Sequence, residues 1–264
     1  MRAFLIAGLL LVPAMAGAQD VAPVQEAAPA KAAAPVLTLQ AELGRLGAEA
    51  ESLHKDLPNF ACKETAVSQI LKKKKVKTEV RFSADLRVRR GNGRSDETSH
   101  YTEVNGKPFE GVEPRAPFMV EGGFDQALDY FRPFTQRCYV YTLKPGRVDF
   151  ESTPRSSEDP VCEGRGSSRG FALLNDDGGV THVERTVDDA DATRFGLVQF
   201  AAVDLMPVEL NGKTYQLSSK MVAEVPKGDY TEHFEATYST CHLFKATITI
   251  RPGSNVVPDE PEKP

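Results

Sequence analysis

The chain has 264 residues and a formal net charge of -5, and 41% of its residues are hydrophobic. The acidic balance argues against a nucleic-acid-binding protein, whose phosphate contacts need a basic surface. Beyond the N-terminal segment no apolar run reaches the about 20 residues that a transmembrane helix requires. The composition therefore predicts a soluble protein that does not span a membrane.

Residues 1–18 have the pattern of a secretory signal peptide. One arginine and the apolar run "FLIAGLLLV" precede the small residues "AGA", which suit cleavage between Ala18 and Gln19. We therefore expect an exported protein, either periplasmic or secreted.

The ends of the remaining chain have a biased composition. Residues 19–36 are rich in alanine and proline, which fits a linker with nothing large to bury, and residues 252–264 resemble a disordered tail. Residues 37–251 have the length of one large β domain. We expect this domain to be a monomer.

The domain opens with a predicted helix over residues 37–57. Leu43, Leu46 and Leu53 recur at intervals of three to seven residues and form one apolar stripe, and Pro58 ends the pattern. The stripe predicts that this helix packs on another element.

After this helix the hydrophobic period changes to two, as expected for strands. In "VRFSADLRVRR", Phe82, Leu86 and Val88 share one face, and the other face carries Arg81, Arg87 and Arg89. Asn-Gly and Asp-Gly pairs recur between such segments and suit the type I′ turns of hairpins. We therefore expect an antiparallel meander. Strands are predicted near residues 63–72, 80–90, 99–104, 139–143, 147–151, 170–174, 180–187, 195–205, 214–225, 230–238 and 243–250.

Two charged clusters fall between these elements. The run Lys72–Lys75 suits a solvated hairpin end or a guard against edge pairing, with contact to an anionic surface as the alternative. The segments "NDDGG" and "DDADAT" lack the spacing of a calcium loop and are interpreted as solvated turns.

A second helix is predicted in "GGFDQALDYFRPF", residues 122–134. Phe124, Leu128 and Phe131 are spaced to lie on one face, and Pro133 ends the pattern. The stripe has two interpretations. It is either ordinary core, or part of a helix that plugs the concave face of a curved sheet and lines a cavity.

The stretch "TYSTCHLFKATITI" places Cys241 beside His242. Successive side chains of a strand point to opposite faces, so these two cannot form a thiolate–imidazole pair. An even number of cysteines in an exported protein favours disulfides. Of the three possible pairings, we expect Cys62–Cys241 and Cys138–Cys162, which join the ends of the fold and close a short loop.

No catalytic or metal-binding pattern is found. The sequence has no C-x-x-C, H-E-x-x-H, G-x-G-x-x-G or Walker A arrangement. We therefore assign no catalytic residue, no metal ligand and no cofactor.

Several short motifs resemble known proteins. "DLPNFACKETAV", "EVNGKPF", "GGFDQAL" and "FEATYSTCHLFKATITI" resemble a group of uncharacterised secreted proteins of soil bacteria such as acidobacteria. The order of elements resembles the half-barrel family of lipoprotein-localisation carriers in the bacterial envelope. That resemblance implies an unclosed antiparallel barrel with a helix-capped apolar cavity. It implies no catalytic residue.

We thus expect an α+β fold that is mainly β, a curved, unclosed half-barrel of about ten strands with an N-terminal helix and a plugging helix. The first functional hypothesis is a non-enzymatic envelope protein that binds a lipid or other apolar ligand. The alternatives are a structural module with a packed core that meets an envelope protein, and a hydrolase. The candidate cavity residues are Phe82, Leu86, Val88, Phe124, Leu128 and Phe131.

Overall fold

The computed structural model describes residues 38–244, apart from residues 92–93, 121–123, 125, 154–158 and 164. The predicted signal peptide, linker and tail lie outside the described residues, and so does most of the last predicted strand. Within the described part, no helix is long and apolar enough to cross a membrane.

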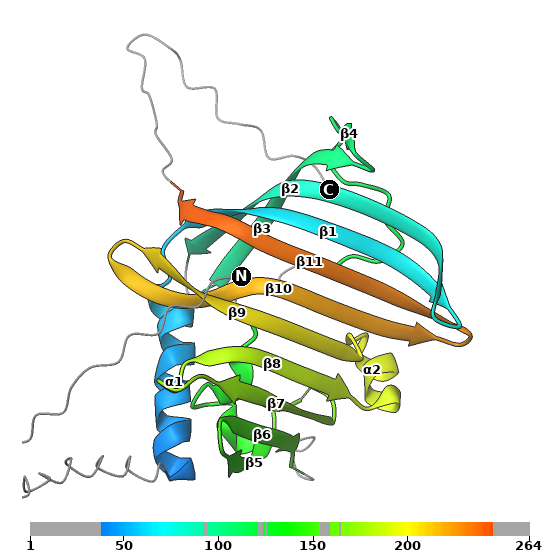
Figure 1. Ribbon diagram of the computed structural model, residues 1–264. Helices are drawn as coiled ribbons and strands as arrows, with labels where there is room; N and C mark the ends of the chain where they lie inside the picture. The colour runs from blue at the N-terminus through cyan, green and yellow to red at the C-terminus, as the bar shows by residue number, and fades with distance from the viewer. Residues whose placement is uncertain are drawn as a thin grey trace, which may run out of the picture. The chain divides into compact units, whose positions relative to one another are not determined.

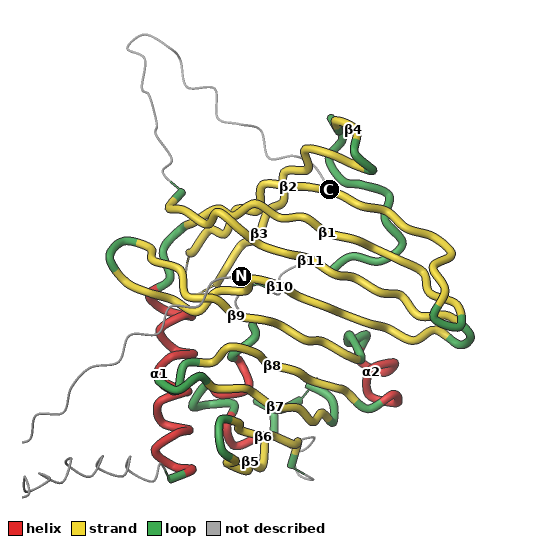
Figure 2. Tube along the Cα trace, viewed as in Figure 1, coloured by secondary structure: helices red, strands yellow, loops and turns green. Residues whose placement is uncertain are grey.

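Eleven strands form one antiparallel sheet in the order β4-β3-β2-β1-β11-β10-β9-β8-β7-β6-β5 (Figures 1 and 2). The strands β4 and β5 are its two edges, so the sheet remains unclosed. The predicted mainly-β fold class is confirmed. The strands are β1 Phe60–Lys72, β2 Lys75–Gly91, β3 Arg94–Val104, β4 Lys107–Pro108, β5 Tyr139–Lys144, β6 Arg147–Ser152, β7 Ser168–Leu174, β8 Val180–Val187, β9 Phe200–Leu210, β10 Lys213–Lys227 and β11 Tyr230–Leu243.

The predicted alternation fixes which face of the sheet is buried. On β2 the side chains of Phe82, Leu86 and Val88 are buried, whereas Arg81 and Arg89 are exposed. Apolar side chains on one face only are typical of an antiparallel sheet with one wet side. We call the buried face the inner face.

The tight turns follow the expected chemistry. Asn105-Gly106 and Asn211-Gly212 connect neighbouring strands with positive φ at both residues, as type I′ turns require. The Lys72–Lys75 run forms the exposed turn between β1 and β2, as expected for a hairpin end.

The sheet consists of two meanders that meet where β1 pairs with β11. The first contains β1 to β4 and the second contains β5 to β11. Two separate strands are predicted near residues 230–238 and 243–250. The structure instead has one continuous strand, β11, that ends at Leu243. Cys62 of β1 and Cys241 of β11 form a disulfide across this junction. The first and last strands of the domain are therefore linked covalently.

The chain between the two meanders has to cross the sheet, because β4 and β5 lie at opposite edges. The described residues between 109 and 138 lie over the inner face, where Phe118 packs near Phe234, Phe124 near Tyr238, and Phe131 near Phe150. The crossing segment is therefore the lid of the core.

The predicted plugging helix at 122–134 is wrong. In this stretch the structure describes only a short 3-10 helix, η1 Asp129–Phe131, and a second one, η2 Gln136–Cys138, follows. The apolar residues of the stripe are still buried, but they pack against different strands along the crossing. Glycine and proline at the ends of so short a segment make an α-helix marginal, and tertiary packing overrides the local period.

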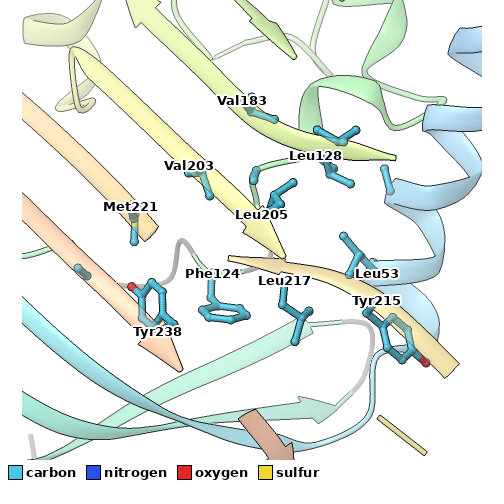
Figure 3. Close-up of a cluster of buried hydrophobic side chains, with 14 of the residues drawn as sticks. Leu53, Phe124, Leu128, Val183, Val203, Leu205, Tyr215, Leu217, Met221 and Tyr238 are labelled. Carbon is cyan, nitrogen blue, oxygen red and sulfur yellow. The ribbon is translucent and has the colours of Figure 1, made fainter. Parts of the chain in front are cut away.

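The N-terminal helix α1, Leu39–Asp56, is close to its predicted range, and Ala41 N donates to the Thr38 hydroxyl at its start (3.3 Å). Gln136 Nε2 donates to the Leu43 carbonyl (3.0 Å), so α1 is docked on the 3-10 turns. A Cβ at Gly47 would lie only 3.2 Å from the carbonyl oxygen of Phe131, so a side chain here would have to displace this backbone by a few tenths of an ångström. Figure 3 shows side chains of β8 to β10, among them Val183, Leu205 and Leu217. They lie near Leu53 of α1 and near Leu128 of the crossing segment.

A second helix, α2 Asp189–Phe195, occurs where the sequence analysis predicts an acidic turn and the start of a strand. The Asp188 side chain caps it by accepting from Ala190 N (3.1 Å), and Gly196 ends it in the left-handed conformation. The strand expected from residue 195 therefore begins only at Phe200.

Candidate functional site

The inner face carries a cavity of about 220 Å³ under the crossing segment. Its floor comes from β1, β2, β3, β10 and β11, and its roof comes from residues 111–120, which we call the strap. We name this hollow the Glu64 cavity. It is smaller than the about 300–1,000 Å³ of most ligand pockets, so it suits a small ligand or one end of a larger one.

Apolar side chains form one wall of the Glu64 cavity. They come from the three strands β2, β10 and β11 and from the strap, which only the folded sheet brings together. The wall consists of Phe82, Leu86, Met119, Val120, Met221 and Phe234. Such a surface favours the apolar part of a ligand over water.

Polar groups line the same cavity. Glu64 is only 6% exposed, and its carboxylate accepts from the Ser99 hydroxyl (3.3 Å) and is hydrogen-bonded to the Tyr238 hydroxyl. Glu97 accepts from the backbone N–H of Phe124 (3.1 Å). These groups give the cavity a hydrogen-bonding side as well as an apolar side.

Burial changes the acidity of this cluster. Removal from water raises the pKa of Glu64, and the hydrogen bonds from Ser99 and Tyr238 act in the opposite direction. Burial, together with the charges of Glu64 and Glu97, raises the pKa of the Tyr238 hydroxyl well above its usual value. Tyr238 therefore remains a proton donor to Glu64 throughout the neutral range.

The strap is held to the sheet by one buried side chain. The Ser68 hydroxyl of β1 donates to the Phe118 carbonyl (2.5 Å) and accepts from the Phe118 N–H (3.0 Å). Ser68 is fully buried, while Val112 on the strap is 94% exposed. The strap is thus fixed near Phe118 and open to solvent at its other end, beside the rim of the cavity.

The structure separates the six predicted cavity residues into two groups. Phe82 and Leu86 line the Glu64 cavity, and their contact with a ligand stays a prediction. The other four do not line it. They are packed in the core with at most 3% exposure: Val88, Phe124, Leu128 and Phe131.

The sequence analysis missed the polar side of the cavity. Glu64 alternates with Phe60, Cys62 and Ala66 on β1, so a period of two counted from Phe60 places its carboxylate on the inner face. Glu97 was not detectable in this way, because its position depends on the register between β2 and β3, where it pairs with Val88.

Both expected cysteine pairs are present as disulfides. Cys62 is joined to Cys241, and Cys138 of η2 is joined to Cys162, and no cysteine is free. His242 is exposed beside Cys241 and does not line the Glu64 cavity. Its Nδ1 lies 3.0 Å from the Thr240 carbonyl oxygen.

Other features of the described residues point less clearly to a site. A larger hollow of about 660 Å³ lies between α2 and the turn after β10, and exposed residues such as Thr193 and Lys227 line it. His182 lies 2.6 Å from Asp204 and does not line the Glu64 cavity. No group of three or more acidic, histidine or cysteine side chains in the described part is arranged to hold a metal ion.

No protein-family model matches the chain, and no curated protein matches it. The resemblance to secreted proteins of soil bacteria therefore stays a prediction. Among solved structures, a DUF1329 family protein from Desulfovibrio piger is 13% identical over 77% of this chain and 92% of that chain, with a TM-score of 0.36.

Two further solved structures resemble the chain. A LolA superfamily protein from Nitrosomonas europaea is 10% identical over 78% of this chain and 94% of that chain, with a TM-score of 0.35. A putative outer membrane lipoprotein-sorting protein domain from Vibrio parahaemolyticus is 11% identical over 75% of this chain and 90% of that chain, with a TM-score of 0.41. These likenesses are weak, and the fold class is defined by the sheet itself.

Proposed function

We propose that this chain is an exported, non-enzymatic binding protein of the cell envelope that holds the apolar part of a ligand in the Glu64 cavity. The observation that carries the proposal is the group of apolar side chains that lines the cavity under the strap. A preformed hollow with one apolar wall and a few polar groups is typical of small-ligand sites.

Export is part of this proposal and rests on the sequence and on the cysteines. The pattern of residues 1–18 is that of a signal peptide, and two disulfides suit an oxidising compartment. We also propose residues 19–36 as a linker, 37–251 as the binding domain and 252–264 as a tail.

The architecture supports a carrier-like or binding role in a second way. The strap closes the cavity with a single extended segment fixed at Phe118 and exposed at Val112. An exposed end of a lid gives a ligand a way in without disruption of the sheet.

Uptake of the fluorescent apolar probe N-phenyl-1-naphthylamine tests the proposal. We expect saturable binding by the wild-type protein and binding at least tenfold weaker in Val120→Trp, whose ring fills the cavity from the strap. Val140→Trp on the edge strand β5, where Val140 is 61% exposed, is the matched control and should bind like the wild type.

Absence of probe uptake by the folded wild-type protein would overturn the proposal. The alternative, a structural or protein-interaction module without a ligand, would then be favoured. Equal weakening by Val120→Trp and Val140→Trp would also count against the cavity as the binding place.

A further inference from the structure

All the charged side chains that line the Glu64 cavity are acidic. Its lining includes the carboxylates of Glu64, Glu97 and Glu113, and none of the described residues that line it is a lysine, arginine or histidine. A hollow bounded by acidic groups and low-dielectric walls concentrates cations and repels anions. A fatty acid or phosphate is therefore the wrong charge for this cavity.

Glu64 is the deepest of these acids. Its hydrogen bonds come from the hydroxyls of Ser99 and Tyr238, and no ion pair to a described lysine or arginine is found. A carboxylate has about four acceptor positions, so two hydroxyl donors leave capacity for another donor. A buried carboxylate without a counter-ion costs free energy, and a cationic ligand would remove that cost.

Aromatic rings surround the same space. Phe82, Tyr101, Phe234 and Tyr238 all line the cavity. The Phe82 ring centroid lies 5.3 Å from that of Tyr101, with the ring planes at 80°, and 6.3 Å from that of Phe234, so these rings form one cluster beside the hollow. Ring faces attract ammonium groups, and this attraction is strongest where water is excluded.

We propose that the Glu64 cavity recognises an amine or alkylammonium group on an apolar ligand, with Glu64 as its counter-ion and the aromatic rings as its cage. This inference rests on the proposed binding function and specifies the ligand class. The volume of about 220 Å³ accommodates the cationic head and the adjoining apolar atoms. The rest of the ligand passes the rim near the exposed Val112.

Displacement of bound N-phenyl-1-naphthylamine by three decyl compounds tests this proposal on the full chain. Decyltrimethylammonium, decanol and decanoate share the alkyl chain and differ in the charge of the head. We expect the ammonium compound to displace the probe about tenfold better than decanol, and decanoate to be the weakest. Tetramethylammonium, which lacks the chain, should displace it poorly.

The Glu64→Gln variant identifies the residue responsible. It keeps the shape and an acceptor oxygen, so affinity for decanol should stay within about twofold, while the preference for the ammonium compound falls to near one. Glu113→Gln at the exposed rim is the matched control and should retain most of the preference. If Glu64→Gln does not fold, the wild-type preference for decyltrimethylammonium over decanol decides by itself whether the cavity recognises the ammonium group.

The outcomes separate the two proposals. Equal displacement by decyltrimethylammonium and decanol, or a preference for decanoate, would overturn the ammonium site and leave apolar binding intact. No uptake of the probe at all would overturn the proposed function. Displacement by tetramethylammonium as strong as by the decyl compound would support the cation site and contradict the apolar ligand.

Discussion

The two halves of the inner face are covered differently. Over β5 to β9 lie α1 and the 3-10 turns, and aromatic rings fill the space: the Phe150 ring lies 5.8 Å from that of Phe131 and 5.6 Å from that of Tyr139. Over β1 to β3, β10 and β11 lies the strap, and the Glu64 cavity remains. We call these the packed half and the open half.

The thickness of the cover explains the difference. A helix with its side chains is about 10 Å wide, so α1 fills the space above the sheet with close-packed side chains. A single extended segment supplies fewer side chains per unit area and leaves room below it. The same sheet therefore carries close-packed side chains on one half and the Glu64 cavity on the other.

Removal of the disulfide between the first and last strands should cause the largest loss of stability. Cys62→Ala combined with Cys241→Ala opens a loop of 179 residues, which costs up to about 5 kcal/mol in the chain-entropy model. The matched pair Cys138→Ala and Cys162→Ala opens a 24-residue loop and should cost up to about 3.5 kcal/mol. Urea unfolding measures both, and a reversed order would contradict this comparison.

Truncation of Phe131 tests the packed half. Phe131 is fully buried, so Phe131→Ala should reduce the free energy of unfolding by about 3–5 kcal/mol. Phe82→Ala in the open half should cost less, because part of the Phe82 ring already faces the cavity. Phe134→Ala, at a 43% exposed phenylalanine, is the control and should change stability by about 1 kcal/mol or less. Equal losses at Phe131 and Phe82 would mean that both halves are packed alike.

Release of the strap should have a smaller effect. Ser68→Ala leaves the N–H and carbonyl of Phe118 without their buried partner, at a cost of about 1–3 kcal/mol. Hydrogen exchange should become faster in residues 111–120 and stay unchanged in β5 to β8. Unchanged exchange in the strap would show that Ser68 does not hold it.

The pH dependence of stability tests the buried acid. Because burial raises the pKa of Glu64 in the folded state, the folded protein keeps a proton that the unfolded chain releases above its ordinary pKa of 4.5. The stabilisation from this bound proton is fully present below pH 4.5. It is lost as the pH rises through the pKa that Glu64 has in the folded protein. Glu64→Gln should therefore gain stability relative to the wild type over that rise.

Thermal unfolding across this pH range measures the difference in stability between the wild-type protein and Glu64→Gln. Glu113→Gln, at the exposed rim, is the control for the change of acid to amide. A difference in stability that does not vary with pH would contradict the burial of an ionisable Glu64.

The sequence predicts the strands more reliably than the site. On β2 the alternation of Phe82 and Leu86 with arginines identifies strand and buried face, and the Asn-Gly turns identify hairpins, because both signals are local. The expectation of export, together with the even number of cysteines, led to the prediction of both disulfides. These predictions depend on neighbouring residues or on simple pairing.

The cover of the sheet could not be predicted in this way. The apolar period of Phe124, Leu128 and Phe131 indicates a helix, but the backbone follows the crossing from β4 to β5, and that path exists only once the two meanders have joined. The Glu64 cavity likewise depends on register between strands far apart in sequence, such as the pairing of Glu64 with Tyr238. Both are consequences of non-local contacts.

The central claim, that the open half binds a ligand, is tested most directly by NMR of ¹³C-methyl methionine. Of the five methionines, Met119 and Met221 line the cavity from the strap and from β10, and Met206 on β9 does not. During titration with N-phenyl-1-naphthylamine, the account predicts saturable shifts of the Met119 and Met221 methyl signals and a constant Met206 signal. Shifts confined to Met206, or no shift at Met119 and Met221, would contradict it.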